Sequence, residues 1–446
     1  MKFKVVVDPK ASTREQFPAV RINDGDGQTI SNLDVQSTAF GFRKLPGKIA
    51  ADFLLVGNII YALDKLVTRS AASDGWTRNL EVEIPVSDPT IWGTVVEDLN
   101  GCISFLTGDQ WRFRFTHNKR ELFGGSSLGS TVSGMAKPET ISLFSGGMDS
   151  LCGVIDWLED HPGKGLLLAA HHDGQMHGPF SDQKNILPTL KQAYPNRIRA
   201  TLVRVGNSDT SPEITLRSRS IVFIALAVVV ASGHEFEGTL LLPENGTIAL
   251  NVPLSPSRRG SCSTRTAHPF YVGGLQGILS KLGIGLTIHN PLMGKTKGEV
   301  AASCSNQALF KATVFDSVSC AKRGHVVTWI NRSANGCGMC MPCVYRRAAL
   351  HKAGLDTEVY GRDICKGQVD FADESKSGPG DLRACMSFLR RNPSRDEIQK
   401  LLLANGSLDV SAMVANADLI VRAFAEIREL FRAKATKEIK RMAGIV

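Results

Sequence analysis

The sequence contains no hydrophobic run long enough to cross a membrane. Its longest apolar stretch, residues 221–231, falls well short of the ~20 residues that a membrane-spanning helix needs. The opening residues, MKFKVVVD, lack the sustained apolar segment of a secretory signal. We therefore expect a soluble protein with no membrane partner.

A disulfide framework is also not expected. The chain has 10 cysteines among 446 residues, and in a protein without a secretory signal these stay reduced. They are therefore expected to be thiols or metal ligands in a cytoplasmic protein. The sequence also shows no internal repeat and no coiled coil of useful length.

What is present is the composition of a globular protein, with 43% apolar and 21% charged residues. The length favours two or three domains. The net charge of +9 is mildly basic, and it suits a nucleotide, a nucleic acid or an acidic protein without deciding among them. Nucleic acid therefore stays open as a partner.

The first part of the chain, residues 1–135, predicts an α+β accessory domain. Strand-like patterns occupy residues 3–7, 80–84 and 111–115, and a helix is expected over residues 50–65. No group of residues in this part indicates a particular chemistry. The Gly/Ser-rich run at residues 124–134 is typical of a flexible linker and marks the expected boundary.

Residues 136–355 change to alternating strands and helices, which predicts an α/β domain with a parallel sheet covered on both faces. Strands are expected at residues 140–144, 166–170, 201–205, 239–242 and 286–289, a strand-like run follows at 313–318, and a mainly apolar helix is expected over 214–232. Ligands of such sheets collect at the carboxyl ends of the strands.

Residues 356–446 predict a C-terminal helical extension. Its last long helix carries an apolar stripe at helical spacing, formed by Met413, Ala417, Ile420, Phe424, Ile427 and Phe431. We expect this stripe to pack on the body of the protein or on a partner chain. The basic end of the same helix is expected to be solvated.

The segment Ser145-Gly-Gly-Met-Asp-Ser150 follows the first of these strands and opens a helix. Glycines at such a turn let backbone N–H groups approach an anion, and the helix start adds partial positive charge. The hydroxyls of Ser145 and Ser150 could donate to phosphate oxygens, while Asp149 could bind Mg²⁺ or cap the helix. The Gly-Lys-Ser/Thr of a Walker A loop is missing.

A second cluster, Cys337-Gly-Met-Cys340-Met-Pro-Cys343, places three thiols on one tight turn. A structural zinc ion takes four tetrahedral ligands, so a fourth ligand must come from elsewhere. Cys320 is the best candidate for that ligand and His325 is the second. An iron–sulfur cluster is the alternative metal group for cysteines at this spacing.

The loop at residues 145–150 resembles the pyrophosphate loop of PP-loop ATP pyrophosphatases, which cleave ATP between the α and β phosphates. Together with the cysteines, it resembles the QueC family of 7-cyano-7-deazaguanine synthases. Further segments match that family in order: residues 173–177, with Asp173 replacing tyrosine; residues 217–223, with Ser220 replacing asparagine; Thr296-Lys-Gly-Glu299; and Cys320 with the three later cysteines. The likeness covers roughly residues 138–354.

Two segments, residues 243–253 and 263–269, do not match the region that selects the deazaguanine in QueC. Long flanking parts are likewise absent from the housekeeping enzyme. In both respects the chain is more similar to the QueC-like proteins of bacterial anti-phage systems, in particular those of the Qat system. The resemblance therefore implies partner proteins in a defence complex, and a homo-oligomer stays open.

The resemblance implies a ligase that uses ATP, Mg²⁺ and Zn²⁺ to adenylate a 7-deazaguanine-type carboxylate, release pyrophosphate and transfer the acyl group to ammonia or to an amine on a partner protein. It implies catalytic roles for Ser145, Asp149, Ser150, Lys297 and Arg219. Nucleotide contacts are implied for residues 145–150, including Gly146, Gly147 and Met148, and for His171, Asp173, Gln175 and Thr296. The implied zinc ligands are Cys320, Cys337, Cys340 and Cys343.

His172, Asn245, Arg265 and His268 are further candidates for the pocket, and Arg265 could pair with a substrate carboxylate or phosphate. Two alternative functions stay open. One is a tRNA-modifying PP-loop enzyme, whose relatives often carry a catalytic cysteine pair away from the zinc. The other is a nucleotide-binding scaffold of a defence complex that does not turn ATP over.

Overall fold

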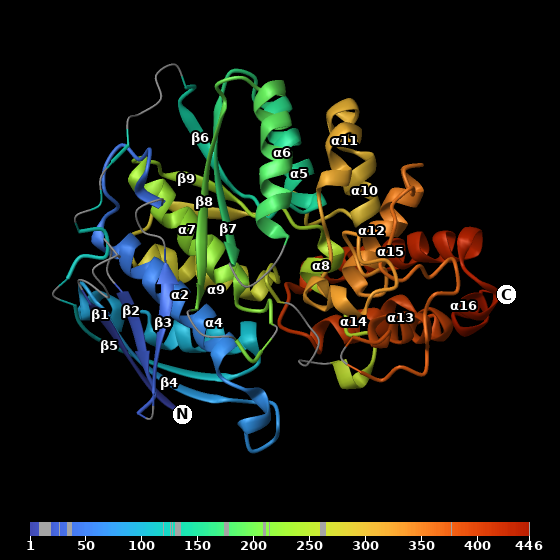
Figure 1. Cartoon of the computed structure of the whole chain (residues 1–446), viewed down its shortest axis with the longest axis horizontal. Coiled ribbons are helices and arrows are strands. Elements are labelled where there is room, and N and C mark those ends of the chain that lie inside the picture. The colour runs from blue at the N-terminus through green and yellow to red at the C-terminus, as the bar shows by residue number, and fades with distance from the viewer. Residues whose placement is uncertain are drawn as a thin grey trace.

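One ten-stranded sheet runs through the molecule in the order β10-β9-β6-β7-β8-β3-β2-β1-β4-β5 (Figure 1). The structure is a computed structural model. It describes residues 1–8, 19–25, 27–33, 38–118, 120–124, 126, 128–129, 135–173, 178–207, 211–213, 215–258, 265–375 and 377–445.

Among the residues that the structure describes, the N-terminal part supplies five strands and three α-helices whose two ends are both described. They are β1 (Lys2–Asp8), β2 (Ala19–Asn23), β3 (Gln28–Leu33), α2 (Lys48–Leu66), β4 (Asn79–Val86), α3 (Pro89–Gly93), α4 (Val96–Thr107) and β5 (Gln110–His117). The expected strands at residues 3–7, 80–84 and 111–115 and the expected helix at 50–65 are confirmed.

The middle part alternates strands and helices. Its first elements are β6 (Pro138–Leu143), α5 (Met148–Asp160), β7 (Gly165–Asp173), α6 (Pro179–Ala193), β8 (Ile198–Asn207), α7 (Arg219–Gly233) and β9 (Gly238–Leu241). Then follow α8 (Gly246–Leu250), α9 (Pro269–Lys281), β10 (Leu286–His289), α10 (Lys297–Ala302), α11 (Gln307–Thr313) and α12 (Met341–Lys352). The strand-like run at 313–318 is wrong: α11 ends there, and a 3₁₀ turn over Val314–Asp316 follows. Val314 of this run is buried together with Phe310 of α11 in one hydrophobic cluster.

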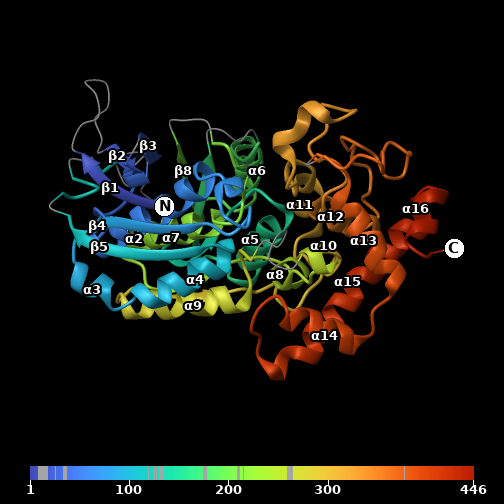
Figure 2. The same cartoon turned by 90° about the horizontal axis from the view of Figure 1, so that it is seen from below.

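The C-terminal part is helical within the described residues. It contains α13 (Gly380–Arg391), α14 (Arg395–Leu403), α15 (Met413–Lys434) and α16 (Lys437–Met442). The apolar stripe of α15 packs inside the chain, against residues of α12, α13 and α14. These helices lie at the opposite end of the molecule from the N-terminal strands in both views (Figures 1 and 2).

The sheet is mostly parallel, with six of its nine strand pairings parallel. An α/β fold with a mostly parallel sheet is therefore confirmed. The N-terminal strands join the middle ones through an antiparallel pairing of β3 with β8, in which Leu33 faces Val205 and Ser31 faces Asn207. The sheet thus continues across the expected domain boundary near residue 135, and that boundary itself stays a prediction.

Helix α7 is apolar on every side because it is enclosed on every side. All residues from Ser220 to Ala231 are buried, and the helix packs between α2 and strands β6 and β7. The contact with α2 is close enough that a Cβ on Gly57 would lie 3.0 Å from the Cβ of Ala225. The expected helix at 214–232 is confirmed from Arg219 onward. Within the described residues, no helix is long and apolar enough to span a membrane.

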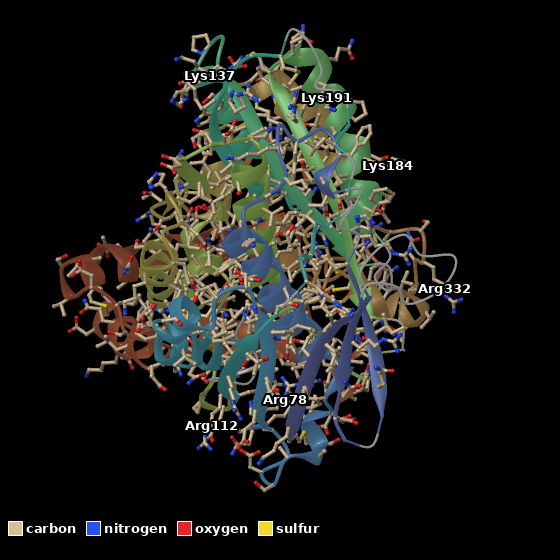
Figure 3. The ribbon with its side chains drawn as sticks, turned by 90° about the vertical axis from the view of Figure 1, so that its left-hand side faces the viewer. Arg78, Arg112, Lys137, Lys184, Lys191 and Arg332 are labelled. Atoms are coloured by element: carbon tan, nitrogen blue, oxygen red, sulfur yellow. The ribbon has the colours of Figure 1, made fainter. Side chains whose placement is uncertain are left out.

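The outer face of the N-terminal strands is charged. Lys2 and Arg112 flank Glu81, and Lys4 and Arg114 flank Glu83, with nitrogen–oxygen distances of 3.5 to 3.7 Å. Figure 3 views the molecule from the side of these strands and labels Arg112. Such exposed ion pairs contribute little stability, about 0–1 kcal/mol each. The opposite face of the same strands carries the core.

Candidate functional site

The loop at residues 145–150 connects the carboxyl end of β6 to the start of α5. Gly146 has φ +81°, and a Cβ there would lie 3.1 Å from the Cβ of Asp182, so this turn requires glycine. Gly147 N donates to Ser145 Oγ (3.2 Å), and the Ser145 and Ser150 hydroxyl oxygens are 3.2 Å apart. No side chain caps the first turn of α5, so its leading N–H groups have no side-chain acceptor.

Asp149 does not cap the helix. Its Oδ2 accepts from Lys297 Nζ (2.7 Å), at the start of α10, and from Asn245 Nδ2 (2.8 Å), which precedes α8. Burial alone would raise the pKa of Asp149, but the charge of Lys297 holds it below its usual value. The second oxygen, Oδ1, is buried without a hydrogen-bond partner among the described residues. An ionised carboxylate with one unused oxygen is thus held at the loop.

Glu244 is a second carboxyl group beside Asp149. Burial, and then the negative charge of Asp149, raise the pKa of Glu244 well above its ordinary value. Asn245 bridges the two acids, because its Nδ2 also lies 3.4 Å from Glu244 Oε1. Its Oδ1 accepts from Ile248 N (3.1 Å) and so caps α8. A buried carboxylate beside a half-buried carboxyl group, with opposed pKa shifts, is a frequent feature of functional sites.

Arg219, the first residue of α7, is a cation to which no carboxylate among the described residues is bonded. Its Nε donates to His171 Nε2 (3.2 Å), and its Nη2 has no hydrogen-bond partner among the described residues. Burial, and then the positive charge of Arg219, lower the pKa of His171 well below its usual value, so the imidazole is neutral. The free side of Arg219 can therefore pair with an anionic ligand.

Asp173 is held by the N-terminal part of the chain. At the end of β7, its Oδ2 accepts from Tyr61 OH (2.7 Å) and forms an ion pair with Lys65 Nζ, both from α2. Lys65 and Asp173 are almost fully buried. Tyr61 also packs edge-on against His171, with ring centres 5.7 Å apart. Helix α2 thus supports the strand end behind Arg219.

Asp149, Arg219, Glu244 and Lys297 line one cavity of about 280 Å³. Its wall includes five residues of the loop, the side chains of Arg219, Glu244 and Lys297, and apolar groups from β6, α7 and the segment after β9. Residues 318–321 line it as well, and Val318 N donates to Gly146 O (3.1 Å). The Arg323–Asp182 ion pair (2.5 Å) lies at the same wall. The cavity therefore combines groups that can donate hydrogen bonds to an anion, the neighbouring acids Asp149 and Glu244, and an apolar surface.

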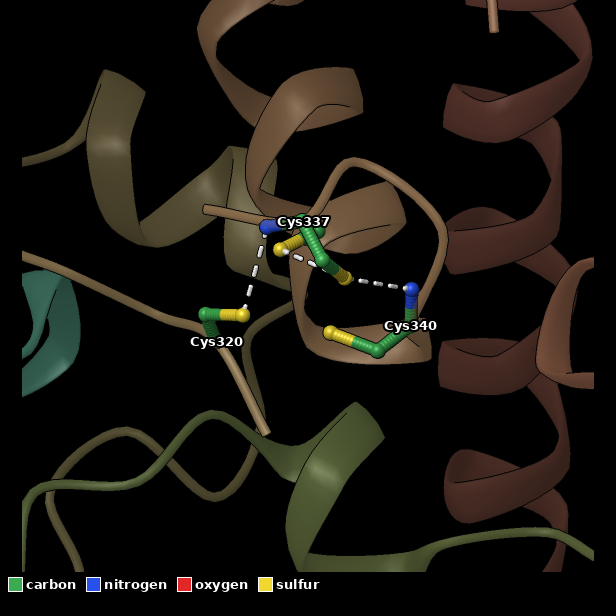
Figure 4. A group of neighbouring side chains, drawn as sticks. Cys320, Cys337 and Cys340 are labelled. Carbon is green, nitrogen blue, oxygen red and sulfur yellow. Dashed lines mark hydrogen bonds between the residues drawn. The ribbon is translucent and has the colours of Figure 1, made fainter. Parts of the chain in front are cut away.

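The sulfurs of Cys320, Cys337, Cys340 and Cys343 all lie within 4.8 Å of one another and could hold a metal ion such as zinc (Figure 4). Backbone N–H groups point at them: Cys337 N donates to Cys320 Sγ (3.3 Å), and Cys340 N donates to Cys337 Sγ (3.2 Å). Among the described residues, the group contains Cys320 and does not contain His325. Cys320 also lines the cavity.

The structure brings together Ser145, Gly147, Met148, Asp149, Ser150, Arg219 and Lys297 on the cavity wall. Gly146, His171 and Asp173 are not among the lining residues. Gly146 and His171 are each bonded to a residue that lines the cavity, Val318 and Arg219, and Asp173 is bonded to Tyr61 and Lys65. Thr296 caps α10: it accepts from Glu299 N (3.1 Å) and donates to Glu426 (2.6 Å). Gln175 lies outside the described residues.

The remaining pocket candidates have structural partners. His172 packs against Phe180, with ring centres 4.2 Å apart and ring planes tilted by 30°. Arg265 lies over the ring of Phe105 and donates to its carbonyl oxygen (2.8 Å). His268 caps α9, and burial followed by the charge of Arg265 lowers its pKa to about 4.

The sequence reasoning missed Glu244, Lys65 and Glu426. Glu244 lies three residues after the end of β9, and the same strand-end argument that selected the loop would also have selected this residue. Lys65 and Glu426 meet the site only through contacts between distant parts of the chain, and no local pattern marks them. Comparison with models of protein families and with curated proteins finds no match to this chain.

Proposed function

We propose that this protein is a PP-loop ATP pyrophosphatase of QueC type, a ligase that adenylates a carboxylate. The observation that carries the proposal is the arrangement around Asp149. This buried carboxylate, bonded to Lys297 and Asn245 and adjacent to Glu244, sits in a glycine-rich strand-to-helix turn on the wall of a cavity. A volume of about 280 Å³ is near the lower end of small-molecule sites, which start at about 300 Å³.

The loop suits the pyrophosphate half of ATP. The hydroxyl of Ser145 and the uncapped N–H groups of α5 are donors on the cavity wall, whereas the Ser150 hydroxyl donates to Gly147 O (2.9 Å) and lies beside the Ser145 hydroxyl. Lys297 and Arg219 add positive charge from two other elements. Donors and cations placed in advance stabilise the charge that develops as pyrophosphate leaves.

Asp149 and Glu244 fit a magnesium ion. Mg²⁺ prefers oxygen ligands and is usually bound through one or two carboxylates together with substrate phosphates. Asp149 Oδ1 is a buried oxygen without a partner, and Glu244 is a neighbouring acid that would lose its proton on binding a cation. When bound, the ion would neutralise charge on the phosphates.

The chemistry follows from the weak reactivity of a carboxylate towards amines. One carboxylate oxygen attacks the α-phosphorus of ATP, and the bond to the bridging oxygen breaks, releasing pyrophosphate. An amine then attacks the acyl carbon and AMP leaves with the electron pair of the C–O bond. In this scheme Nη2 of Arg219, which has no partner among the described residues, binds an anionic group of the substrate or nucleotide.

The cysteine group fits one zinc ion. Four sulfurs at about 2.3 Å from a tetrahedral ion lie about 3.8 Å apart. Cys337 Sγ and Cys343 Sγ are 3.9 Å apart, close to that value. A cubane [4Fe–4S] cluster binds each cysteine to a different iron, which places the sulfurs farther apart. The compact group therefore favours zinc.

The deazapurine substrate and the defence context rest on the resemblance alone. We propose a 7-deazapurine carboxylate as acyl donor, and ammonia or an amine of a partner protein as acceptor. Co-purification with the proteins encoded beside it, followed by intact-mass measurement, tests the acceptor. A mass increase on a partner supports acyl transfer, whereas unchanged partner masses favour ammonia or a scaffold.

Relatives of the tRNA-modifying alternative often carry a catalytic cysteine pair away from the metal. The described cysteines outside the cluster are Cys102, Cys152, Cys304, Cys365 and Cys385, and none of them lines the cavity. Burial raises the pKa of Cys102 and Cys385 to about 12. Such thiols are poor nucleophiles at neutral pH. This observation favours the ligase.

The decisive experiment measures pyrophosphate release from Mg·ATP with the carboxylate substrate. We expect D149A to lower the rate at least ~100-fold, the usual effect of removing a group that stabilises transition-state charge. D160A is the matched control, because Asp160 is exposed at the other end of α5. Wild-type rates in D149A would overturn the assignment, and ATP binding without turnover in the wild type would favour the scaffold.

A further inference from the structure

The C-terminal extension, residues 356–446, contacts both short helices that supply the partners of Asp149. Helix α10 begins with Lys297, and α8 follows Asn245. Helix α15 of the extension packs against α8, α10 and α12. The extension therefore contacts the two helices that position Lys297 and Asn245 at the proposed nucleotide site.

Glu426 makes the central contact with α10. Its Oε1 accepts from Thr296 Oγ1 (2.6 Å), and its Oε2 accepts from Gly298 N (3.1 Å). These two residues immediately flank Lys297. The carboxylate of Glu426 thus binds the backbone segment that carries the lysine, on both sides of it.

The contact is buried and closely packed. Glu426 is 5% exposed, and a Cβ on Gly298 would lie 2.5 Å from its Oε1. Lys352 Nζ lies 3.0 Å from the same oxygen and balances the charge. Arg422, one turn earlier on α15, binds Glu299 at 2.7 Å. Hydrogen bonds to a charged group are stronger than those between neutral groups, so this contact can fix the position of α10.

The extension holds α8 as well. Asn405 Nδ2 donates to Leu250 O (3.0 Å) and Asn251 O (3.1 Å), at the end of that helix. At its start, a Cβ on Gly246 would lie 2.7 Å from Leu419 Cδ1 of α15. Both ends of α8 are therefore fixed by residues of the extension.

We propose that Glu426 is a positioning residue for the nucleotide site, and that through it the C-terminal extension sets the affinity for Mg·ATP. Glu426 fixes the start of α10, and this start places Lys297 Nζ 2.7 Å from Asp149. The inference rests on the proposed function, since it gives the extension a role in the same site. Glu426 is not among the residues that line the cavity, so it acts through α10.

The test compares E426A, E426Q and the control E429Q, since Glu429 is an exposed acid on the same helix. Isothermal titration with Mg·ATP gives Kd for each full-length variant, while metal content and urea unfolding check that the protein is intact. We expect E426A to raise Kd at least tenfold and E429Q to leave it unchanged. E426Q keeps one acceptor for Thr296 and should fall between them.

A double mutant separates positioning from general loss of structure. If Glu426 acts through Lys297, then E426A/K297A binds Mg·ATP no more weakly than K297A alone. A further tenfold loss in the double mutant would contradict the proposal. So would wild-type affinity in a folded, metal-containing E426A or E426Q protein.

These outcomes are distinguishable from failure of the proposed function. If the wild type does not bind Mg·ATP, or if D149A binds it as well as the wild type, the proposed function fails. If D149A loses binding while E426A and E426Q retain it, only the positioning role fails. Should E426A not fold, E426Q and its double mutant with K297A still decide between these results.

Discussion

At the scale of single residues, the position of Glu244 beside Asp149 is not explained by a contribution to the stability of the fold. A carboxyl group beside another buried carboxylate costs folding free energy whenever it ionises, and its raised pKa reflects that cost. Residues of this kind are common where function requires a group that the fold alone would not favour. Replacing Glu244 should therefore separate stability from nucleotide binding.

We expect E244Q to be more stable than the wild type at neutral pH. Because the pKa of Glu244 is raised in the folded state, the native protein binds more protons, so its free energy of unfolding falls as pH rises above about 4.3, the ordinary glutamate value. Glutamine stays neutral and escapes this loss, so its stability relative to the wild type should increase as the pH rises. Urea unfolding of both proteins between pH 5 and pH 8 gives the comparison. A difference that does not grow with pH would contradict the pKa shift.

The same substitution should weaken Mg²⁺-dependent ATP binding, because an amide is a poorer magnesium ligand than a carboxylate. Titration with ATP in the presence and absence of Mg²⁺ separates the two effects. We expect the magnesium-dependent gain in affinity to fall about tenfold or more in E244Q. An unchanged gain would remove Glu244 from the magnesium site.

At the scale of elements, α2 contributes a buried ion pair to the end of β7. Removing one partner of such a pair leaves an uncompensated charge and costs about 3–5 kcal/mol. We expect that loss for K65M, measured by urea unfolding, and partial recovery in K65M/D173N. K48M is the control, since the Lys48–Glu121 pair on the same helix is exposed. A loss below about 1 kcal/mol in K65M would show that the pair does not hold α2 to β7.

The cysteine turn is a second element that supports the cavity. Residues 318–323 connect it to the loop through Val318 N and Gly146 O, and to α6 through Arg323 and Asp182. We expect C337S to lose bound metal and to weaken Mg·ATP binding about tenfold, because outer contacts of this kind typically carry 10–100-fold effects. Elemental analysis and titration measure both. C365S, outside the cluster, should match the wild type; a metal-free C337S with normal affinity would show that the turn is independent of the cavity.

Much of the fold was predictable where the signal is local. Apolar runs marked β6, β7 and α7, and glycines marked the loop, because these patterns reflect burial and turn geometry within a few residues. The strand-like run at 313–318 failed because a short apolar run fits a buried helix equally well. The bond from Lys65 to Asp173 spans 108 residues and that from Glu426 to Thr296 spans 130, and no local pattern encodes either.

At the scale of the whole molecule, the continuous sheet bears on the predicted boundary near residue 135. A fragment of residues 136–446 would expose the edge of β8 and the apolar side of α7 that α2 covers. We expect this fragment to be insoluble when expressed alone. A soluble fragment with cooperative unfolding would instead support separate domains.

The β3–β8 pairing also affects how the chain is made. Ribosomes add ~5–20 residues per second, so Leu33 would wait roughly 10–35 seconds before its partner Val205 is synthesised. During that interval the edge of β3 has no partner on that side and could pair with another nascent chain. A chaperone that shields the first strands during translation should therefore raise the yield of this protein more than one added after release.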